Sequence, residues 1–211
     1  MVNPHEVEID GRKLVVYDHD DLSEPGTGRA YTGSWAWRSS FVLGQWMGSR
    51  TSLSLKGKRA VELGAGTGVP GLVAAAMGAD VVLTDIQALI PGLQRNIDEN
   101  GLGEKARAMA LVWGDGCSGI DPPVDFILMS DVWYDVESMP DLCKTLRELS
   151  YGDTKILMAC ELRLVASECL EIMAEEGFVL SEVPQSELHP QWQDQDFAVF
   201  IATLGEKKKD I

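Results

Sequence analysis

Basic side chains are scarce in this sequence. Its 211 residues carry 18 Lys and Arg against 33 Asp and Glu, which gives a formal net charge of −15. A general nucleic-acid binder needs a basic face to neutralise phosphates, so we expect no nucleic-acid partner. The acidic surface suits a cationic partner, or it serves solubility alone.

Cysteines and long apolar runs are also few. The four cysteines form no Cys-x-x-Cys pair, which disfavours a zinc site, and we expect reduced, buried thiols and no metal. No apolar run approaches the ~18 residues of a membrane span, so we expect no membrane partner. The first 14 residues are polar and acidic, unlike a signal or transit peptide. We therefore expect a cytoplasmic protein, with the nucleus as the alternative.

The chain has the length of one domain, at the usual ~100–200 residues per domain. Near its start, two short alternating runs flank Asp10-Gly11, a pattern typical of a β-hairpin. The polar segment that follows is typical of a loop. We expect a hairpin and loop extension over residues 1–33, the main domain over 34–204 and a flexible tail over 205–211.

Strand and helix patterns alternate through the main domain. Short apolar runs predict strands at Arg59–Leu63, Asp80–Thr84, Ala108–Trp113, Val124–Ser130, Lys155–Cys160, Phe178–Val183 and Phe197–Thr203. Apolar residues at helical spacing predict helices at Ser34–Met47, with Ser34 as its cap, and at Val69–Met77, Ile86–Asn100, Met139–Leu149 and Leu164–Glu176. The alternation predicts an α/β fold, a parallel sheet with helices on both faces. The last two strands have no helix between them, so we expect one antiparallel strand at the end.

The densest motif is Gly64-Ala65-Gly66-Thr67-Gly68, where the first strand of the main domain meets its first helix. Glycines let the backbone approach a ligand closely, and the helix start offers it free N–H groups. The spacing fits neither the dinucleotide fingerprint Gly-x-Gly-x-x-Gly nor a P-loop. Glu62, just before the motif, organises the loop or meets an amine of the ligand.

Asp85 ends the next predicted strand, 21 positions after Gly64. A carboxylate in that place can accept hydrogen bonds from two ribose hydroxyls. The alternative is structural, a tight turn followed by an Asp that caps a helix. Together, the loop, its strand context and the acid favour a site for a ligand that carries a ribose.

Several further stretches match motifs of one protein family and follow the family's order along the chain. They are Ala36-Trp37, Val42-Leu43, Val61–Gly71, Val82–Asp85, Asn96 with Asn100, Trp113-Gly114, Ser130–Tyr134, and Glu161 with Arg163. With them the sequence resembles the class I S-adenosylmethionine-dependent methyltransferases, which have a Rossmann-like seven-strand sheet. More narrowly, it resembles the methyltransferase-like 21 group of protein lysine methyltransferases, whose Asp-x-x-Tyr motif is matched by Asp131 and Tyr134.

The resemblance implies S-adenosyl-L-methionine as cofactor and a role for each matching residue. Gly64, Ala65 and Gly66 would wrap its methionine portion, Asp85 would hold the ribose, and Trp113 would lie against the adenine. Trp37 would pack near the cofactor, and Ser130 would contact it through its backbone. The implied partner is a protein substrate, a chaperone or another cytosolic protein, and we expect a monomer.

Asp131 and Tyr134 are the candidate catalytic residues. Asp131 ends a strand at the edge where open α/β sheets bind ligands. We expect its carboxylate to hold and orient the incoming ammonium, and Tyr134 to supply an aromatic wall and a hydroxyl, a role that Trp133 could share. The alternative is that Asp131 caps the next helix and Tyr134 packs in its first turn.

Protein-lysine N-methyltransfer is therefore the expected activity. Two other activities stay open at this point, because a fold does not fix a substrate. One is methyl transfer to another nucleophile, such as a protein histidine or a small molecule. The other is a cofactor-binding scaffold that works through a protein partner.

Overall fold

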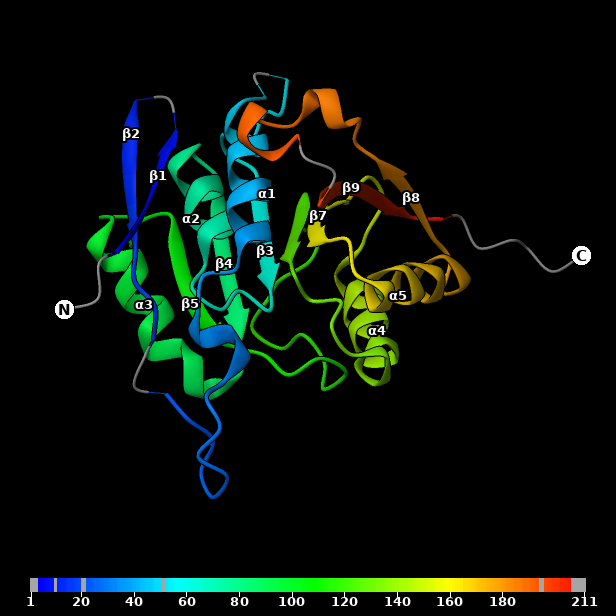
Figure 1. The fold of residues 1–211 in the computed structure, drawn as a ribbon, viewed down its shortest axis with the longest axis horizontal. Helices are drawn as coiled ribbons and strands as arrows, with labels where there is room; N and C mark the ends of the chain where they lie inside the picture. Colours follow the sequence, from blue (N-terminus) through cyan, green and yellow to red (C-terminus); the bar gives the residue numbers. More distant parts are fainter. Residues whose placement is uncertain (1–3, 10, 20–21, 51, 194–195, 206–211) are drawn as a thin grey trace, which may run out of the picture.

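A computed structural model describes residues 4–9, 11–19, 22–50, 52–193 and 196–205. Asp10 of the expected Asp-Gly turn lies outside these residues, as does the expected tail beyond Gly205. Within the described part of the chain, a seven-stranded sheet is covered by helices, and a two-stranded hairpin packs at its side (Figure 1).

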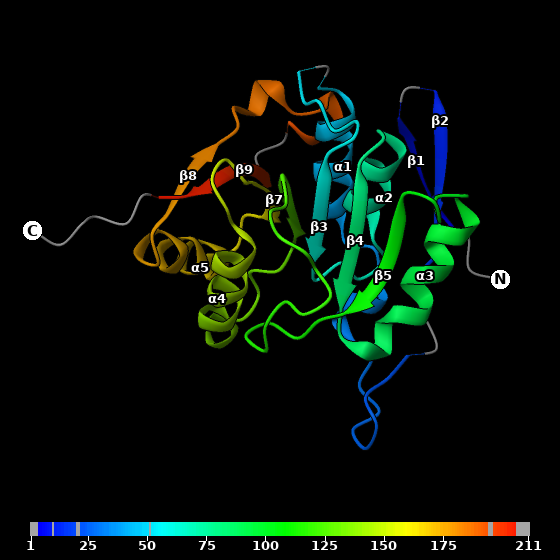
Figure 2. The ribbon, with the colours of Figure 1, turned by 180° about the vertical axis from the view of Figure 1, so that it is seen from behind.

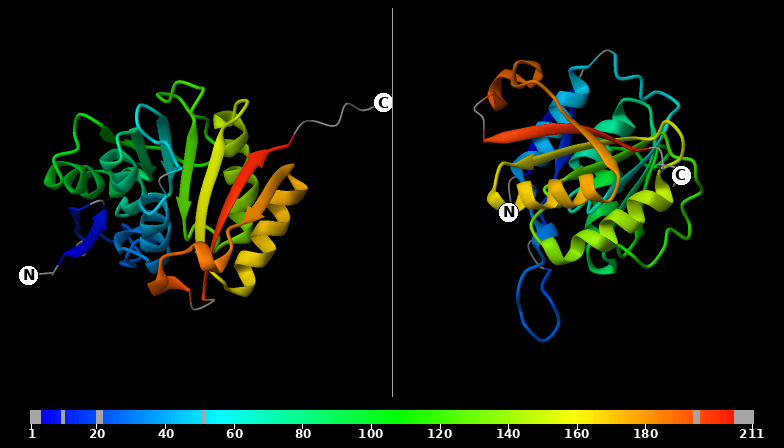
Figure 3. Two further views of the ribbon diagram at one scale, coloured as in Figure 1. Left: turned by 90° about the horizontal axis from the view of Figure 1, so that it is seen from above. Right: turned by 90° about the vertical axis from the view of Figure 1, so that its right-hand side faces the viewer.

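The central sheet has the strand order β5-β4-β3-β6-β7-β9-β8. The strands are β3 (Arg59–Leu63), β4 (Asp80–Asp85), β5 (Ala106–Ala110), β6 (Phe126–Ser130), β7 (Lys155–Glu161), β8 (Phe178–Glu182) and β9 (Phe197–Leu204). The first five are parallel, and β9 lies between β7 and β8 antiparallel to both (Figure 3). The expected sheet with an antiparallel last strand is confirmed.

Two hydrophobic cores lie on the two faces of this sheet. Helices α1 (Arg38–Gly48), α2 (Val69–Ala76) and α3 (Ile90–Glu99) contribute to one core, and α4 (Met139–Leu149) and α5 (Leu164–Glu175) to the other. Strand β6 alternates between them, with Leu128 in the first core and Ile127 and Met129 in the second. The view from behind shows β3 and β4 in front of α1 and α2 (Figure 2).

The hairpin is part of the first core. Strands β1 (His5–Ile9) and β2 (Arg12–Val16) pair antiparallel and bury Val7, Ile9, Leu14 and Val16. Two side chains of the α3 region bind the chain at the end of the hairpin, because Asn100 pairs with the backbone of Val15 and Asn96 with that of Tyr17. These contacts fix the point at which the chain leaves the hairpin for the sheet.

Several predicted boundaries were wrong: the helix expected from Ile86 begins at Ile90, after a 3₁₀ turn, and the strand expected from Val124 begins at Phe126. Two further differences change the surroundings of the site. The first helix begins at Arg38 rather than Ser34, since residues Thr32–Ser34 form a separate 3₁₀ turn and the Ser34 hydroxyl caps nothing. The strand expected at Ala108–Trp113 is β5, which ends at Ala110 because its neighbour β4 ends opposite, at Asp85. Both differences bring tryptophans, Trp35 and Trp113, out of regular elements and into loops.

Among the residues that the structure describes, no helix has both the length and the apolar character needed to cross a membrane. The same described residues contain no cluster of three or more His, Cys, Asp or Glu side chains that could hold a metal ion.

Candidate active site

The glycine motif forms the turn from β3 into α2. Gly64 and Gly66 have φ angles of 62° and 54°, a region that side chains disfavour. A Cβ atom at Gly64 would lie 3.0 Å from Val132, and one at Gly66 would lie 3.0 Å from the carbonyl oxygen of Gly33. The loop is therefore built from backbone, with neighbouring segments packed directly against it.

Asp85 ties the end of β4 to this loop. Its carboxylate accepts hydrogen bonds from the backbone N–H groups of Gly66 and Ile86, both at 2.7 Å. Burial raises the pKa of the carboxyl, and the two N–H donors counteract that rise. Each carboxylate oxygen keeps a lone pair for a further donor, such as a ribose hydroxyl.

A cavity of about 460 Å³ opens at the carboxyl ends of the parallel strands. Its lining includes nine of the ten residues expected from the sequence: Trp37, Gly64, Ala65, Gly66, Asp85, Trp113, Ser130, Asp131 and Tyr134. The fold thus brings the glycine loop and the Asp-x-x-Tyr motif to one space, at the edge of the sheet where such folds bind ligands.

Glu62 is the expected site residue that lies elsewhere. Its side chain is fully buried behind the loop, where one carboxylate oxygen accepts from the N–H of Gly71, on α2, at 2.9 Å. Its other oxygen has no partner, and burial raises the pKa of Glu62 well above its ordinary value. Of the two roles expected for it, this position favours organisation of the loop.

Asp131 follows β6 with a φ of 55°, the only positive φ at a non-glycine residue in the described part of the chain. Asp is one of the few side chains that tolerate this conformation, and such residues cluster at functional sites. Its N–H donates to the carbonyl of Ala159, on β7, which holds the turn in place. Burial raises the pKa of Asp131, while the nearby charge of Arg163 lowers it.

Tyr134 stands at the mouth of the cavity and is half exposed. Burial of its other half raises the pKa of its hydroxyl, with a smaller contribution from the charge of Asp85. Trp133 points the other way, into the core, where it packs edge-on against Phe200, so it does not share the role expected of Tyr134. The side chain that caps the following turn is Asp135, not Asp131.

The family model for lysine methyltransferases matches residues 18–176, which include the whole glycine motif and the Asp-x-x-Tyr motif. The chain belongs to the lysine methyltransferase family. This match confirms that the chain is a protein-lysine methyltransferase that uses S-adenosyl-L-methionine as its methyl donor.

Relatives of this lysine methyltransferase support the narrower resemblance to the methyltransferase-like 21 group. Protein N-lysine methyltransferase METTL21A of Danio rerio is 36% identical over 152 residues, which cover 70% of this chain and 69% of that protein. EEF1A lysine methyltransferase 3 of Mus musculus is 35% identical over 113 residues, 53% of this chain and 49% of that one. The fold is similar to that of the glycopeptide N-methyltransferase MtfA in complex with sinefungin, with a TM-score of 0.65, 10% identity and coverage of 83% and 90%.

Several residues to which the sequence assigned no role also line the cavity of the lysine methyltransferase. Thr32, Gly33 and Trp35 line the cavity, and the indole N–H of Trp37 donates to the carbonyl of Thr32 at 2.8 Å. Trp35, which falls within the helix predicted at Ser34–Met47, instead lies before α1 and is 42% exposed. The sequence predicts a polar loop before that helix, but no local pattern shows that this segment folds back over the glycine loop.

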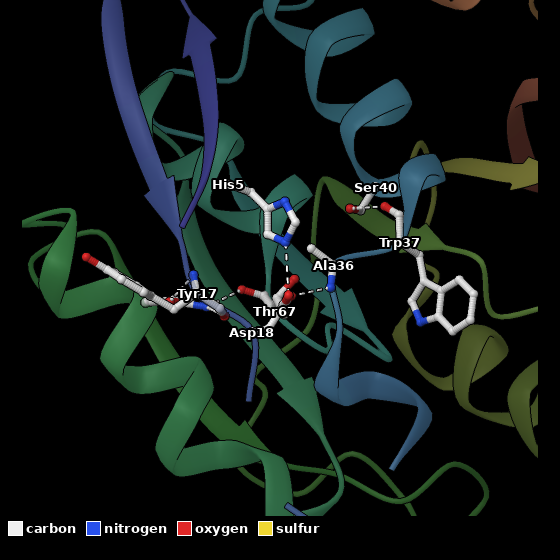
Figure 4. Close-up of polar contacts among 8 residues, drawn as sticks. His5, Tyr17, Asp18, Ala36, Trp37, Ser40 and Thr67 are labelled. Carbon is white, nitrogen blue, oxygen red and sulfur yellow. Dashed lines mark hydrogen bonds and ion pairs between the residues drawn. The ribbon is translucent and has the colours of Figure 1, made fainter. Parts of the chain in front are cut away.

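A short chain of polar contacts holds this segment in place. Asp18 accepts from the N–H of Ala36 at 2.8 Å and contacts His5, on the hairpin, at 3.0 Å (Figure 4). Nearby, His19 is buried and lies 3.3 Å from the carbonyl oxygen of Gly66. The hairpin therefore positions residues 32–37 beside the glycine loop.

Arg163 is a further residue of the cavity to which the sequence assigned no role. It lines the cavity from the loop between β7 and α5, with its guanidinium 3.9 Å from the carboxylate of Asp131. The same guanidinium pairs with Glu161 and lies 5.8 Å from the ring centre of Trp37. Its position depends on the pairing of β6 with β7, which the sequence alone does not show.

Proposed function

We propose that this lysine methyltransferase holds S-adenosyl-L-methionine across the ends of β3 and β4 and receives the acceptor lysine at the end of β6. One observation carries the proposal: a continuous cavity of about 460 Å³ joins the glycine loop and Asp85 to Asp131 and Tyr134. Methyl transfer needs donor and acceptor within one space, aligned and shielded from water.

The residues on the cofactor side fit this group. Gly64, Ala65 and Gly66 would lie along the methionine portion, because the loop presents backbone with no side chain to obstruct it. Asp85 would accept hydrogen bonds from the ribose hydroxyls with the lone pairs that Gly66 and Ile86 leave free. The cavity carries carboxylates and aromatic faces, which suit a cationic sulfonium better than a phosphate.

Three further residues complete the cofactor side. Trp113 lies close to Gly64 and would pack on the adenine, while Trp37 would cover the cofactor from the start of α1. Ser130 ends β6 within the cavity and would contact the cofactor through its backbone. Glu62 would act from behind the loop, since its hydrogen bond to Gly71 fixes the start of α2.

Asp131 and Tyr134 would bind the acceptor. The Asp131 side chain is only 13% exposed, so an ammonium that reaches it exchanges water for a carboxylate in a site of low dielectric. The Tyr134 ring beside it would confine the lysine side chain and attract its cationic form. Together they would direct the nitrogen toward the cofactor side of the cavity.

The acceptor nitrogen reacts only after it loses a proton, because the pKa of lysine is ~10.4 and an ammonium has no lone pair. S-adenosyl-L-methionine supplies a methyl group on a positively charged sulfur, so a new nitrogen–carbon bond replaces the carbon–sulfur bond. Asp131 would hold the nitrogen in line for this exchange, and the released proton would pass through water to the solvent.

The finer assignments concern the partner and the setting. We infer a substrate with a lysine in a basic, accessible stretch, because a net charge of −15 attracts cationic segments. A chaperone or another cytosolic protein remains our candidate, with the enzyme acting as a monomer in the cytoplasm. The names of the relatives, which include an EEF1A lysine methyltransferase, support a protein substrate of this kind.

The test is methyl transfer from radiolabelled S-adenosyl-L-methionine to a lysate of cells that lack this enzyme, followed by mass spectrometry of the labelled band. We expect a labelled lysine, and at least a 100-fold lower rate with Asp131→Asn, roughly the loss of a charged hydrogen bond in the transition state. Asn tolerates the left-handed backbone at this position, so the substitution removes charge without adding strain.

Glu137→Gln is the matched control, since it removes an exposed carboxylate six residues away and should leave the rate unchanged. Calorimetry with S-adenosylhomocysteine should give the same affinity for wild type and Asp131→Asn. A labelled histidine or small molecule would contradict the proposed acceptor, and full activity of Asp131→Asn would contradict its catalytic role.

A further inference from the structure

The cavity holds one positively charged side chain among several acidic ones. Among the described residues that line the cavity, Arg163 is the one basic side chain, against the carboxylates of Asp85, Asp131 and Asp141. Glu161, at the end of β7, adds a fourth carboxylate beside the guanidinium. The lone cation stands next to Asp131, where the proposed function places the lysine.

Two contacts keep the Arg163 guanidinium in this place. Glu161 forms an ion pair with it from the adjacent strand end, and the ring of Trp37 lies 5.8 Å away across the mouth of the cavity. Arg163 itself directly precedes α5, so its backbone is fixed by the start of that helix. The side chain is thus held from two sides although it is 40% exposed.

The distance between the Arg163 guanidinium and the Asp131 carboxylate excludes a direct hydrogen bond. At 3.9 Å the guanidinium nitrogen is too far to form a hydrogen bond with the carboxylate oxygen. Arg163 therefore leaves the lone pairs of Asp131 to other donors, such as the backbone N–H of Glu161 and an incoming ammonium, while its positive charge still acts on the carboxylate.

A carboxylate alone presents a difficulty for the reaction. It stabilises the ammonium form of lysine and so raises the pKa of the very group that must lose a proton. A nearby positive charge has the opposite effect, because it disfavours a second cation. The two neighbours of the acceptor nitrogen therefore act on its proton in opposite directions.

We propose that Arg163 is a positioning residue that offsets the charge of Asp131, so that the acceptor lysine is held in line yet releases its proton to water. The inference rests on the proposed function, whose acceptor site it deepens. The proton leaves the nitrogen to water and the electron pair stays on nitrogen, ready for the methyl carbon, so no further co-reactant is needed.

The other groups that face Asp131 and Arg163 do not supply this positive charge. Cys160 lies buried near Asp131, where burial raises its pKa to about 12 and keeps the thiol neutral. Tyr31 and Tyr134 line the cavity with phenol rings that bring no positive charge, and Asp85, Asp141 and Glu161 are acidic side chains. Removal of Arg163 would leave the acceptor nitrogen among carboxylates, which favour the ammonium.

The experiment compares Arg163→Gln, Arg163→Lys and wild type, with the acceptor protein purified from the band that wild type labels. For Arg163→Gln we expect kcat at pH 7 to fall about tenfold, the effect of a shift of roughly one pKa unit in the bound amine. The deficit should close as the pH rises toward 10, and KM should stay level or fall, because the ammonium is held more tightly. Arg163→Lys keeps the charge and should keep most of the wild-type profile.

Arg147→Gln is the matched control, because Arg147 also pairs with a glutamate, Glu176, at similar exposure, but lies far from the cavity lining. Thermal melting and calorimetry with S-adenosylhomocysteine report on folding and on the cofactor side. A loss that is equal at every pH, or a parallel loss of S-adenosylhomocysteine affinity, would overturn the inference and leave Arg163 as a support for Trp37. Absence of labelling by wild type would instead reject the proposed function.

Discussion

The two ends of the cavity differ in what lines them, backbone at one end and side chains at the other. The end proposed for the cofactor is mainly backbone: Gly66 is buried, Asp85 is engaged by two N–H groups, and Gly33 packs directly on Gly66. The end proposed for the acceptor is formed by side chains, among them Tyr134, which is 51% exposed, and Arg163, whose side chain is 40% exposed. A rigid backbone pocket suits a ligand that is always the same, and exposed side chains suit a large partner that must dock and leave.

This difference predicts which property a substitution at each end of the cavity changes. Changes at the cofactor end should alter affinity for the cofactor and its product, because they move the backbone of the loop. Changes at Asp131 and Arg163 should alter rate and pH dependence at constant cofactor affinity. The following substitutions test the comparison, from the largest expected effect to the smallest.

Gly66→Ala should produce the largest effect. The new methyl group would lie 3.0 Å from the Gly33 carbonyl oxygen, at a φ of 54° that already disfavours a side chain. We expect the affinity for S-adenosylhomocysteine to fall by at least about 100-fold, roughly 2.7 kcal/mol, in calorimetry.

Gly152→Ala supplies the control for this substitution. Gly152 has nearly the same backbone, with a φ of 58°, but nothing within 4 Å of the added methyl group. It should cost only the backbone strain, about 1 kcal/mol of folding stability, and leave product affinity unchanged. If both variants bind the product equally well, the cofactor end is not the rigid backbone site described above.

The sequence located the glycine-loop end of the cavity more completely than the end around Asp131, for a physical reason. The glycine loop and Asp85 are adjacent elements of one strand–helix–strand unit, so their spacing along the chain fixes their spacing in space. Arg163 meets Asp131 only because β6 pairs with β7, and Trp35 reaches the cavity only because residues 32–37 lie across the glycine loop. Neither contact has a local signal.

The pH dependence of folding stability tests the role of Glu62 behind the glycine loop. Because burial raises its folded pKa above the unfolded value of about 4.3, the unfolded state binds fewer protons between the two values. Its contribution to stability is therefore full below about pH 4 and is lost as pH rises toward the raised pKa.

Glu62→Gln removes this titration. We expect the free energy of unfolding of the variant, measured by urea denaturation, to fall less between pH 5 and pH 8 than that of wild type. Product affinity should change far less than in Gly66→Ala, because Glu62 lies outside the cavity lining. An identical pH slope in both proteins would mean that Glu62 stays charged in its buried site.

Ser34→Ala should have the smallest effect, although the sequence pattern alone predicts the opposite. A helix cap stabilises a protein by about 1 kcal/mol, and the sequence pattern predicts Ser34 as the cap of the first helix. In the structure its hydroxyl is buried without a partner, four residues before α1 begins. Removal of such a group costs no hydrogen bond, so we expect a change within about 0.5 kcal/mol in urea denaturation and unchanged methyl transfer. A loss near 1 kcal/mol would show that the helix does start at Ser34, and the segment over the glycine loop would then need a different course.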